Sequence, residues 1–210
     1  MTRVVNIVYN GRYMILTFHT QHFFKMQAGD TILALNPVNA STSKKVNKFG
    51  SDIAISSYFA GDMEVFETAT YGDKEPIALY GPGSYEVDGI QITGFDIPLA
   101  GEHHTLYTFT FDDIRVAVLG NIDQKSALTP DAMEALDNRD IIFVPATEAG
   151  FELATKFTPR VVVPTGYNDV SEIKDFLETL SSEQMTQVDK LTLKFKDIEA
   201  LQSFAYVFTA

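Results

Sequence analysis

The chain has 210 residues, of which 45% are hydrophobic and 21% charged, and its 16 Lys and Arg against 28 Asp and Glu give a net charge of −12. This composition is ordinary for a globular protein and too hydrophobic for a disordered one. The sequence contains no cysteine, which excludes disulfides, thiol catalysis and cysteine zinc sites, and its negative charge opposes nucleic-acid binding, which depends on cationic side chains.

The chain has no signals for a membrane or for export. No apolar run approaches the roughly 20 residues of a membrane-spanning helix, and segment 1–18 alternates polar and apolar residues instead of forming a signal-peptide core. We therefore expect a cytoplasmic protein with no membrane association. A single domain over residues 1–210 is also expected, because no flexible linker or internal repeat divides the sequence.

The first two thirds of the sequence carries the turn signals of β-hairpins. Asn10-Gly11 separates predicted strands at 4–9 and 13–18, and Asn-Gly is a strong hairpin signal because both turn residues need positive φ. Three further hairpins are predicted, which pair 23–26 with 31–35, 84–87 with 90–95, and 105–111 with 114–119.

After about residue 120 the pattern changes to strands that alternate with helices. Thr129-Pro130 is a typical helix start, with Thr as the N-cap and Pro at the first helical position. Helices are predicted at 130–136, 148–157 and 171–180, and strands at 140–144, 160–164, 191–195 and 204–208. Strands joined through helices indicate crossover connections, so we predict an α+β fold in which two sheets lie between helical layers.

Six short strings occur in a characteristic order between residues 24 and 167. The most specific is GPGSYEVDGI at 81–90, and the others lie at 24–37, 51–56, 119–121, 140–145 and 158–167. Together they resemble the metallo-β-lactamase fold superfamily, in particular its branch of small bacterial lactonase-like hydrolases. The resemblance implies an αββα sandwich, with two mixed sheets packed face to face and helices outside.

The resemblance also implies where a metal site would lie. That family binds one or two ions, zinc or in some branches manganese, through a His-x-His-x-Asp-His motif and histidines and a bridging Asp further along the chain. The motif is replaced here by Ser57-Tyr58-Phe59-Ala60-Gly61-Asp62. The matched ligand positions are therefore Ser57, Phe59, Gly61, Asp62, Asn121 and Gly166.

Two further positions of the family pattern differ here. The third ligand histidine of the family would fall near Ile97 or Pro98, and Asn36 stands where the family has an aspartate. A catalytic zinc needs about three protein ligands and an open position for water. Serine is a poor ligand and phenylalanine and glycine offer none, so Asp62 and Asn121 are the matched residues that could coordinate an ion.

Without an ion, nothing lowers the pKa of the attacking water from ~15.7 toward ~7. We therefore predict no catalytic residues, no metal and no cofactor, and a non-catalytic binding or interaction module with a protein or small-molecule partner. The alternative is a zinc- or manganese-dependent hydrolase with a remodelled or mononuclear site.

A rebuilt metal site would draw on Asp62, Asn121, Asp123, His103 and His104. His103 and His104 lie in a predicted loop before the strand at 105–111, and adjacent residues of an extended chain point to opposite faces, so one ion cannot easily bind both. We expect them to belong to a polar loop. His19 and His22 are expected to be turn or surface residues.

Two aromatic features complete the expectations. Phe59 stands at the position of the second motif histidine, and we predict that it points into the former metal cleft and fills it, because protein interiors avoid voids. The last strand places Phe204, Tyr206 and Phe208 on one face. That face is predicted to belong to the core, with a homo-oligomer contact as the alternative.

Overall fold

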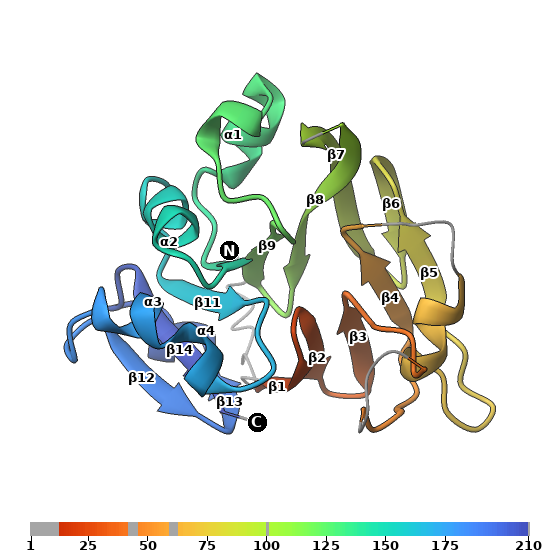
Figure 1. The fold of residues 1–210 in the computed structure, drawn as a ribbon. Coiled ribbons are helices and arrows are strands. Elements are labelled where there is room, and N and C mark those ends of the chain that lie inside the picture. Colours follow the sequence, from red (N-terminus) through yellow and green to blue (C-terminus); the bar gives the residue numbers. More distant parts are fainter. Residues whose placement is uncertain (1–12, 42–45, 59–62, 100, 210) are drawn as a thin grey trace, which may run out of the picture.

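The structure is a computed structural model that describes residues 13–41, 46–58, 63–99 and 101–209. Two mixed β-sheets pack face to face, and helices lie outside them (Figure 1). The predicted αββα sandwich is confirmed. None of the helices within these ranges is long and apolar enough to cross a membrane.

The first sheet has six strands within the described residues, in the order β13-β1-β2-β3-β4-β5. They are β1 (Met14–Thr20), β2 (Phe23–Ala28), β3 (Thr31–Leu35), β4 (Ile53–Ser56), β5 (Ile77–Tyr80) and β13 (Lys190–Leu193). Strands β1, β2 and β3 pair antiparallel, whereas β3, β4 and β5 pair parallel.

The second sheet has eight strands within the same ranges, in the order β12-β14-β11-β10-β9-β8-β7-β6. They are β6 (Gly83–Val87), β7 (Ile90–Leu99), β8 (Glu102–Phe111), β9 (Ile114–Val118), β10 (Ile141–Pro145), β11 (Val161–Thr165), β12 (Met185–Val188) and β14 (Phe204–Phe208). The hairpins β6–β7 and β8–β9 are antiparallel, and β9, β10, β11 and β14 run parallel.

The helices are short and cover the outer faces of both sheets. They are α1 (Pro130–Leu136), α2 (Glu148–Thr155), α3 (Lys174–Glu178), α4 (Phe195–Ile198) and the 3₁₀ segments η1 (Met63–Ala69), η2 (Lys125–Ala127) and η3 (Val170–Ile173). Leu136 of α1 and Leu153 of α2 pack onto the second sheet. On the other side, Phe66 of η1 packs onto Ala34 and Ala54 of the first sheet.

Local sequence signals explain several element boundaries. Thr129 accepts a hydrogen bond from the Ala132 amide and so caps α1 as predicted, with Pro130 at the first position. The helix predicted at 171–180 is divided into η3 and α3. Strands β5 and β12 were not predicted. Of the hairpin predicted around Asn10-Gly11, the first strand and the turn lie outside the described residues, and the second strand, predicted at 13–18, is β1.

The core lies between the sheets and is rich in aromatic side chains. Phe24 packs against Phe18, Phe143 and Phe208, with ring centroids 5.1–5.2 Å apart. In β14 the predicted burial pattern is only partly right. Phe208 is fully buried, but Phe204 and Tyr206 are half-buried and make an edge contact with each other. The alternate residues Ala205 and Val207 are fully buried.

Candidate functional site

The chain segments that follow β4, β9 and β11 meet at one end of the sandwich. Ser57 comes directly after β4, Asn121 lies just beyond β9, and Gly166 follows β11. A Cβ added to Gly120 would lie 2.7 Å from the Cβ of Ser57, so the first two segments are in contact. The structure therefore brings the described ligand positions of the family pattern to one place.

The turn between β1 and β2, which belongs to the first sheet, is bonded to the end of β11 in the second sheet. The amide of Gln21 donates to the carbonyl of Tyr167 at 2.7 Å, and the amide of Gly166 donates to the carbonyl of Gln21 at 2.9 Å. These two backbone hydrogen bonds hold the turn against the end of β11. They place His22, the next residue of the turn, beside Gly166.

The imidazole of His22 takes up the space next to Gly166. Gly166 has a φ of +95°, and a Cβ added to it would lie 3.0 Å from both Cε1 and Nε2 of His22. Real Cβ atoms rarely approach neighbours so closely, so a larger side chain at residue 166 and the His22 ring exclude each other. The position of the late family histidine is thus occupied by an imidazole from another part of the chain.

Hydrogen bonds orient this imidazole, and burial keeps it neutral. The Thr165 hydroxyl donates to the carbonyl of Val144 at 3.1 Å, so its oxygen accepts from Nδ1–H of His22 at 2.8 Å. Burial lowers the pKa of His22 from 6.5 to about 4, although a hydrogen bond with the Asn121 side chain opposes the shift. The ring is therefore neutral at pH 7.

Tyr58 lies between the two parts of the site. Its ring makes edge contacts with His22 and His104, with centroids 5.6 and 6.4 Å apart, and residue 58 forms an isolated β-bridge with residue 104. Burial raises the pKa of its phenol. The phenol ring is the group that connects the two histidines here.

Two buried polar atoms beside Tyr58 are unsatisfied. The Ser57 hydroxyl and Nδ1 of His104 are buried, and neither has a hydrogen-bond partner among the described residues. The Ser57 amide, by contrast, donates to Oδ1 of Asn36 at 2.7 Å. Asn36 thus holds the backbone at Ser57, directly after β4, in place.

Among the described residues, the donor set does not fit a catalytic zinc or manganese ion. Within the ranges that the structure describes, no group of three His, Asp or Glu side chains could hold a metal. Ser57, Asn121 and Gly166 supply at most weak oxygen ligands, and the His22 ring is already hydrogen-bonded to Thr165 and Asn121.

The structure changes several expectations for the histidines. His103 and His104 lie within β8 instead of a loop, because β7 and β8 extend to Leu99 and Glu102. Their side chains are 76% and 9% exposed, and His103 pairs with Asp96 at 2.8 Å outside the site. In the pairing of β7 with β8, Ile97 lies opposite His104 and Pro98 opposite His103.

His22 lies in a turn, as expected, but it is half-buried and part of the site, whereas the expectation for His19 is wrong. His19 lies in β1 and packs between aromatic rings, 4.9 Å from both Phe23 and Phe49, and burial lowers its pKa to about 4. Asp123 is half-buried beyond Asn121 and forms no metal-binding group with described residues. The one sequence signal for His22 was the glycine at 166, which leaves space for another group.

Part of the predicted site cannot be compared. Phe59, Ala60, Gly61 and Asp62 lie outside the described residues, so the placement of Phe59 in the former cleft stays a prediction.

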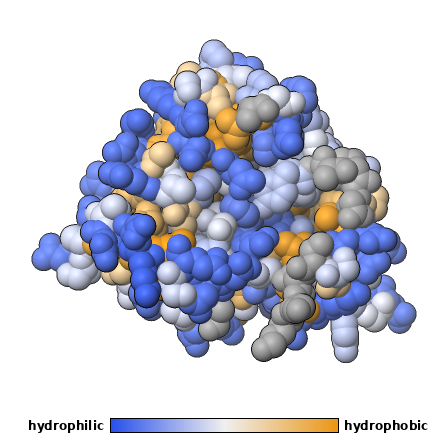
Figure 2. All heavy atoms as spheres, in the orientation of Figure 1, coloured by the Kyte–Doolittle hydropathy of each residue, from blue (hydrophilic) through white to orange (hydrophobic). Residues whose placement is uncertain are grey.

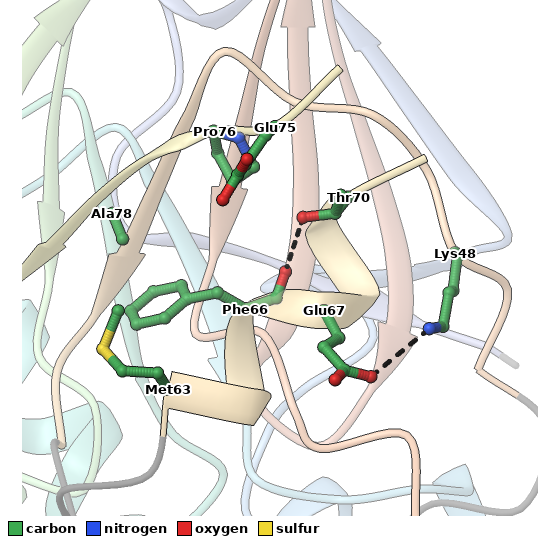
Figure 3. A pocket seen from close by; sticks show the side chains of 8 residues that line it. All are labelled: Lys48, Met63, Phe66, Glu67, Thr70, Glu75, Pro76 and Ala78. Carbon is green, nitrogen blue, oxygen red and sulfur yellow. Dashed lines mark hydrogen bonds and ion pairs between the residues drawn. The ribbon is translucent and has the colours of Figure 1, made fainter. Parts of the chain in front are cut away.

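A separate cavity of about 390 Å³ lies between η1 and β5 (Figure 3). The ring of Phe66 points toward Ala78 and Met63 at one wall, and at the other Glu67 pairs with Lys48 at 3.5 Å. None of its lining residues belongs to the cluster around His22. The face of the molecule shown in Figure 2 is largely hydrophilic with scattered apolar areas, in keeping with the high negative charge.

Comparison with known proteins yields structural matches only. No family model matches the sequence, and no curated protein matches it. A crystal structure of a proposed zinc-dependent hydrolase of the metallo-β-lactamase superfamily from Thermotoga maritima matches with a TM-score of 0.73 and 19% identity, covering 93% of this chain and 98% of that chain.

Two further structures show the same similarity. A proposed metal-dependent hydrolase from Parabacteroides distasonis has a TM-score of 0.58 and 19% identity, covering 80% of this chain and 90% of that one. The metallo hydrolase Igni18 from Ignicoccus hospitalis has a TM-score of 0.56 and 16% identity, covering 87% and 99%. At these identities the matches establish a common fold, and function has to be argued from the site.

Proposed function

We propose that this chain, which has the metallo-β-lactamase fold of those structures, is a non-catalytic protein that acts as a binding or interaction module. The observation that carries the proposal is the His22 imidazole beside Gly166. A neutral ring, hydrogen-bonded to Thr165 and Asn121, takes the space in which the family pattern has a ligand histidine.

The chemistry of hydrolysis supports this proposal. A catalytic ion must bind several strong donors and still keep a position for the water that it activates. Here Asn121 and Gly166 stand where the family pattern has strong donors, and the imidazole beside Gly166, that of His22, is already hydrogen-bonded to Thr165 and Asn121. We accordingly propose no metal cofactor, and a protein or small molecule as the partner.

Elemental analysis of the purified full chain tests the proposal. After exposure to zinc and manganese and removal of free ions, we expect well below one equivalent of bound metal. We also expect no turnover of ester, lactone, phosphodiester or β-lactam substrates with either ion present. Stoichiometric metal together with turnover would overturn the proposal.

One observation favours the alternative of a remodelled hydrolase site. Nδ1 of His104 is buried without a partner in the described part of the chain, and it lies next to Tyr58, which leads into the segment containing Asp62. If a site exists there, Asp62→Ala must abolish metal binding and turnover. His103→Ala, which removes an exposed histidine from the neighbouring position, is the matched control.

A further inference from the structure

The described part of the chain contains three arginines, Arg115, Arg139 and Arg160, and all three gather around Asp140. The Asp140 carboxylate is 1% exposed and lies at the start of β10. In a protein with a net charge of −12, this is a local concentration of positive charge. It is independent of the cluster around His22.

The Asp140 carboxylate has no free acceptor position for a hydrogen bond from Arg139. Its two oxygens accept from Nε, Nη2 and the backbone amide of Arg115, each at 2.9 Å, and from Nε of Arg160 at 3.2 Å. A carboxylate offers about four acceptor positions, so these four donors saturate it. One carboxylate thus serves two guanidinium groups, and Arg139 needs another partner.

The guanidinium of Arg139 finds no such partner among the described residues. Its Nε is buried and has no hydrogen bond to any described residue. Burial and the charge of Arg115 lower the pKa of the guanidinium. Leaving a buried cationic donor unsatisfied is costly, and such groups in native proteins call for an explanation.

The side chain of Arg139 lines a cavity of about 450 Å³ that we call the Arg139 cavity. Thr93 of β7 and Thr108 of β8 are paired in register, so their side chains share one face of the second sheet. The full lining is Gly89, Gln91, Thr93, Thr108, Phe109, Thr110, Asp113 and Arg139. Hydroxyl and amide groups therefore surround a single unpaired guanidinium.

The cavity beside η1 differs in this respect. There the ammonium of Lys48 is paired with Glu67, and the hydroxyl of Thr70 donates to the carbonyl of Phe66 (Figure 3). Lys48 and Thr70 are thus already partnered there, whereas Arg139, which lines the other cavity, has an Nε without an acceptor among the described residues.

We propose that the Arg139 cavity binds a small monocarboxylate that carries several hydroxyl groups. Guanidinium groups bind carboxylates through two parallel hydrogen bonds. The threonine hydroxyls and the Gln91 amide can donate to and accept from ligand hydroxyls. The Asp113 carboxylate at the rim repels a second negative charge and accepts from a hydroxyl, which favours a monoanion over a dianion.

Titration calorimetry with gluconate, a polyhydroxylated monocarboxylate, tests the proposal at constant ionic strength. We expect gluconate to bind with a dissociation constant of about 1 mM or tighter, glucose not to bind, and inorganic phosphate to bind more weakly. Arg139→Gln should weaken gluconate binding by about tenfold or more, and Arg139→Lys by less, because lysine keeps the charge but not the paired donors.

Lys156→Gln removes the same charge from an exposed position at the end of α2 and should leave binding unchanged. Thermal denaturation should show that Arg139→Gln is at least as stable as the parent, because it removes an unpaired buried charge. Absence of gluconate binding, or equal binding by Arg139→Gln, would overturn the proposal. Neither result affects the proposed non-catalytic role, which depends on metal content and turnover.

Discussion

The His22 imidazole and residue 166 compete for the same space: a Cβ on Gly166 would lie 3.0 Å from Cε1 and Nε2 of the ring. The family pattern matches a ligand histidine to residue 166, directly after β11, whereas this chain has a glycine there and a histidine on the β1–β2 turn. In this chain the two segments, which belong to different sheets, are joined by backbone hydrogen bonds.

This competition predicts a coupled pair of substitutions. Gly166→His should destabilise the protein by roughly 2–4 kcal/mol through overlap with His22 and through strain at positive φ. In the His22→Ala background the same substitution should cost about 1–3 kcal/mol less. Urea denaturation of the parent, of Gly166→His, of His22→Ala and of the double variant measures this coupling.

Gly101→His is the matched control for the strain that a residue other than glycine meets at positive φ. Gly101 also has positive φ, +86°, but a Cβ there meets nothing within 4 Å. The substitution should show no coupling to His22→Ala. Equal costs for Gly166→His with and without His22 would show that the ring does not occupy the space.

The burial of His22 predicts a pH dependence of stability. Because the folded-state pKa is lowered from 6.5 to about 4, the unfolded chain binds more protons between these values. The free energy of unfolding should therefore fall as the pH falls from 6.5 to 4, with a slope of at most about 1.36 kcal/mol per unit for this residue. The slope fades as the pH rises past 6.5 and vanishes at about pH 8, where the histidine is neutral in both states.

Urea denaturation across this pH range checks the sign. His22→Asn should reduce the slope, and His103→Asn, at an exposed position outside the cluster, should change it less. His19, also shifted to about 4, accounts for part of the remaining slope. NMR titration of the His22 ring to a midpoint near 6.5 would contradict the burial argument.

If the protein binds no metal, as we propose, its melting temperature should not depend on metals. A bound ion would stabilise the native state by roughly 2.7 kcal/mol at 100 times its dissociation constant. We therefore expect the melting temperature to be the same with a chelator, with added zinc or manganese, and with neither. A drop of several degrees on chelation would favour the hydrolase alternative.

Local signals made most of the fold predictable. The predicted pairings of 84–87 with 90–95 and of 105–111 with 114–119 are both found, and their turns, Asp88-Gly89 and Asp112-Asp113, have positive φ at every position. The loss of ligands was likewise visible, since glycine at 166 and asparagine at 121 are read directly from the sequence.

The replacement for the lost ligand was not predictable. The position of His22 depends on the backbone pairing of Gln21 with Tyr167, which joins segments from opposite sheets and leaves no local pattern. The same reason applies to His19, because its neighbour Phe49 belongs to a distant loop. Periodicity reports which face of a strand is buried, but not what it packs against.

The predicted placement of Phe59 also has a direct test. If Phe59 fills the former metal cleft, Phe59→Ala should cost about 3–5 kcal/mol of unfolding free energy, the usual range for truncation of a buried aromatic. Tyr71→Ala, at a position that is 69% exposed, should stay within about 0.5 kcal/mol. Chemical denaturation compares the two, and equal small effects would place Phe59 at the surface.

Asp140 should be a much stronger determinant of stability than its position at a strand end suggests. Besides its side-chain hydrogen bonds to Arg115 and Arg160, its amide donates to the Arg115 carbonyl and its carbonyl accepts from the amides of Arg160 and Val161. It thereby connects the start of β10 to both neighbouring strands.

Asp140→Asn keeps the shape of the side chain but removes the charge that two guanidinium groups share. We expect the free energy of unfolding to fall by about 3–5 kcal/mol. Asp137→Asn, at the exposed end of α1, should change stability by no more than about 0.5 kcal/mol. Urea denaturation of both variants decides the matter, because a loss below about 1 kcal/mol in Asp140→Asn would mean that solvent already screens the arginines.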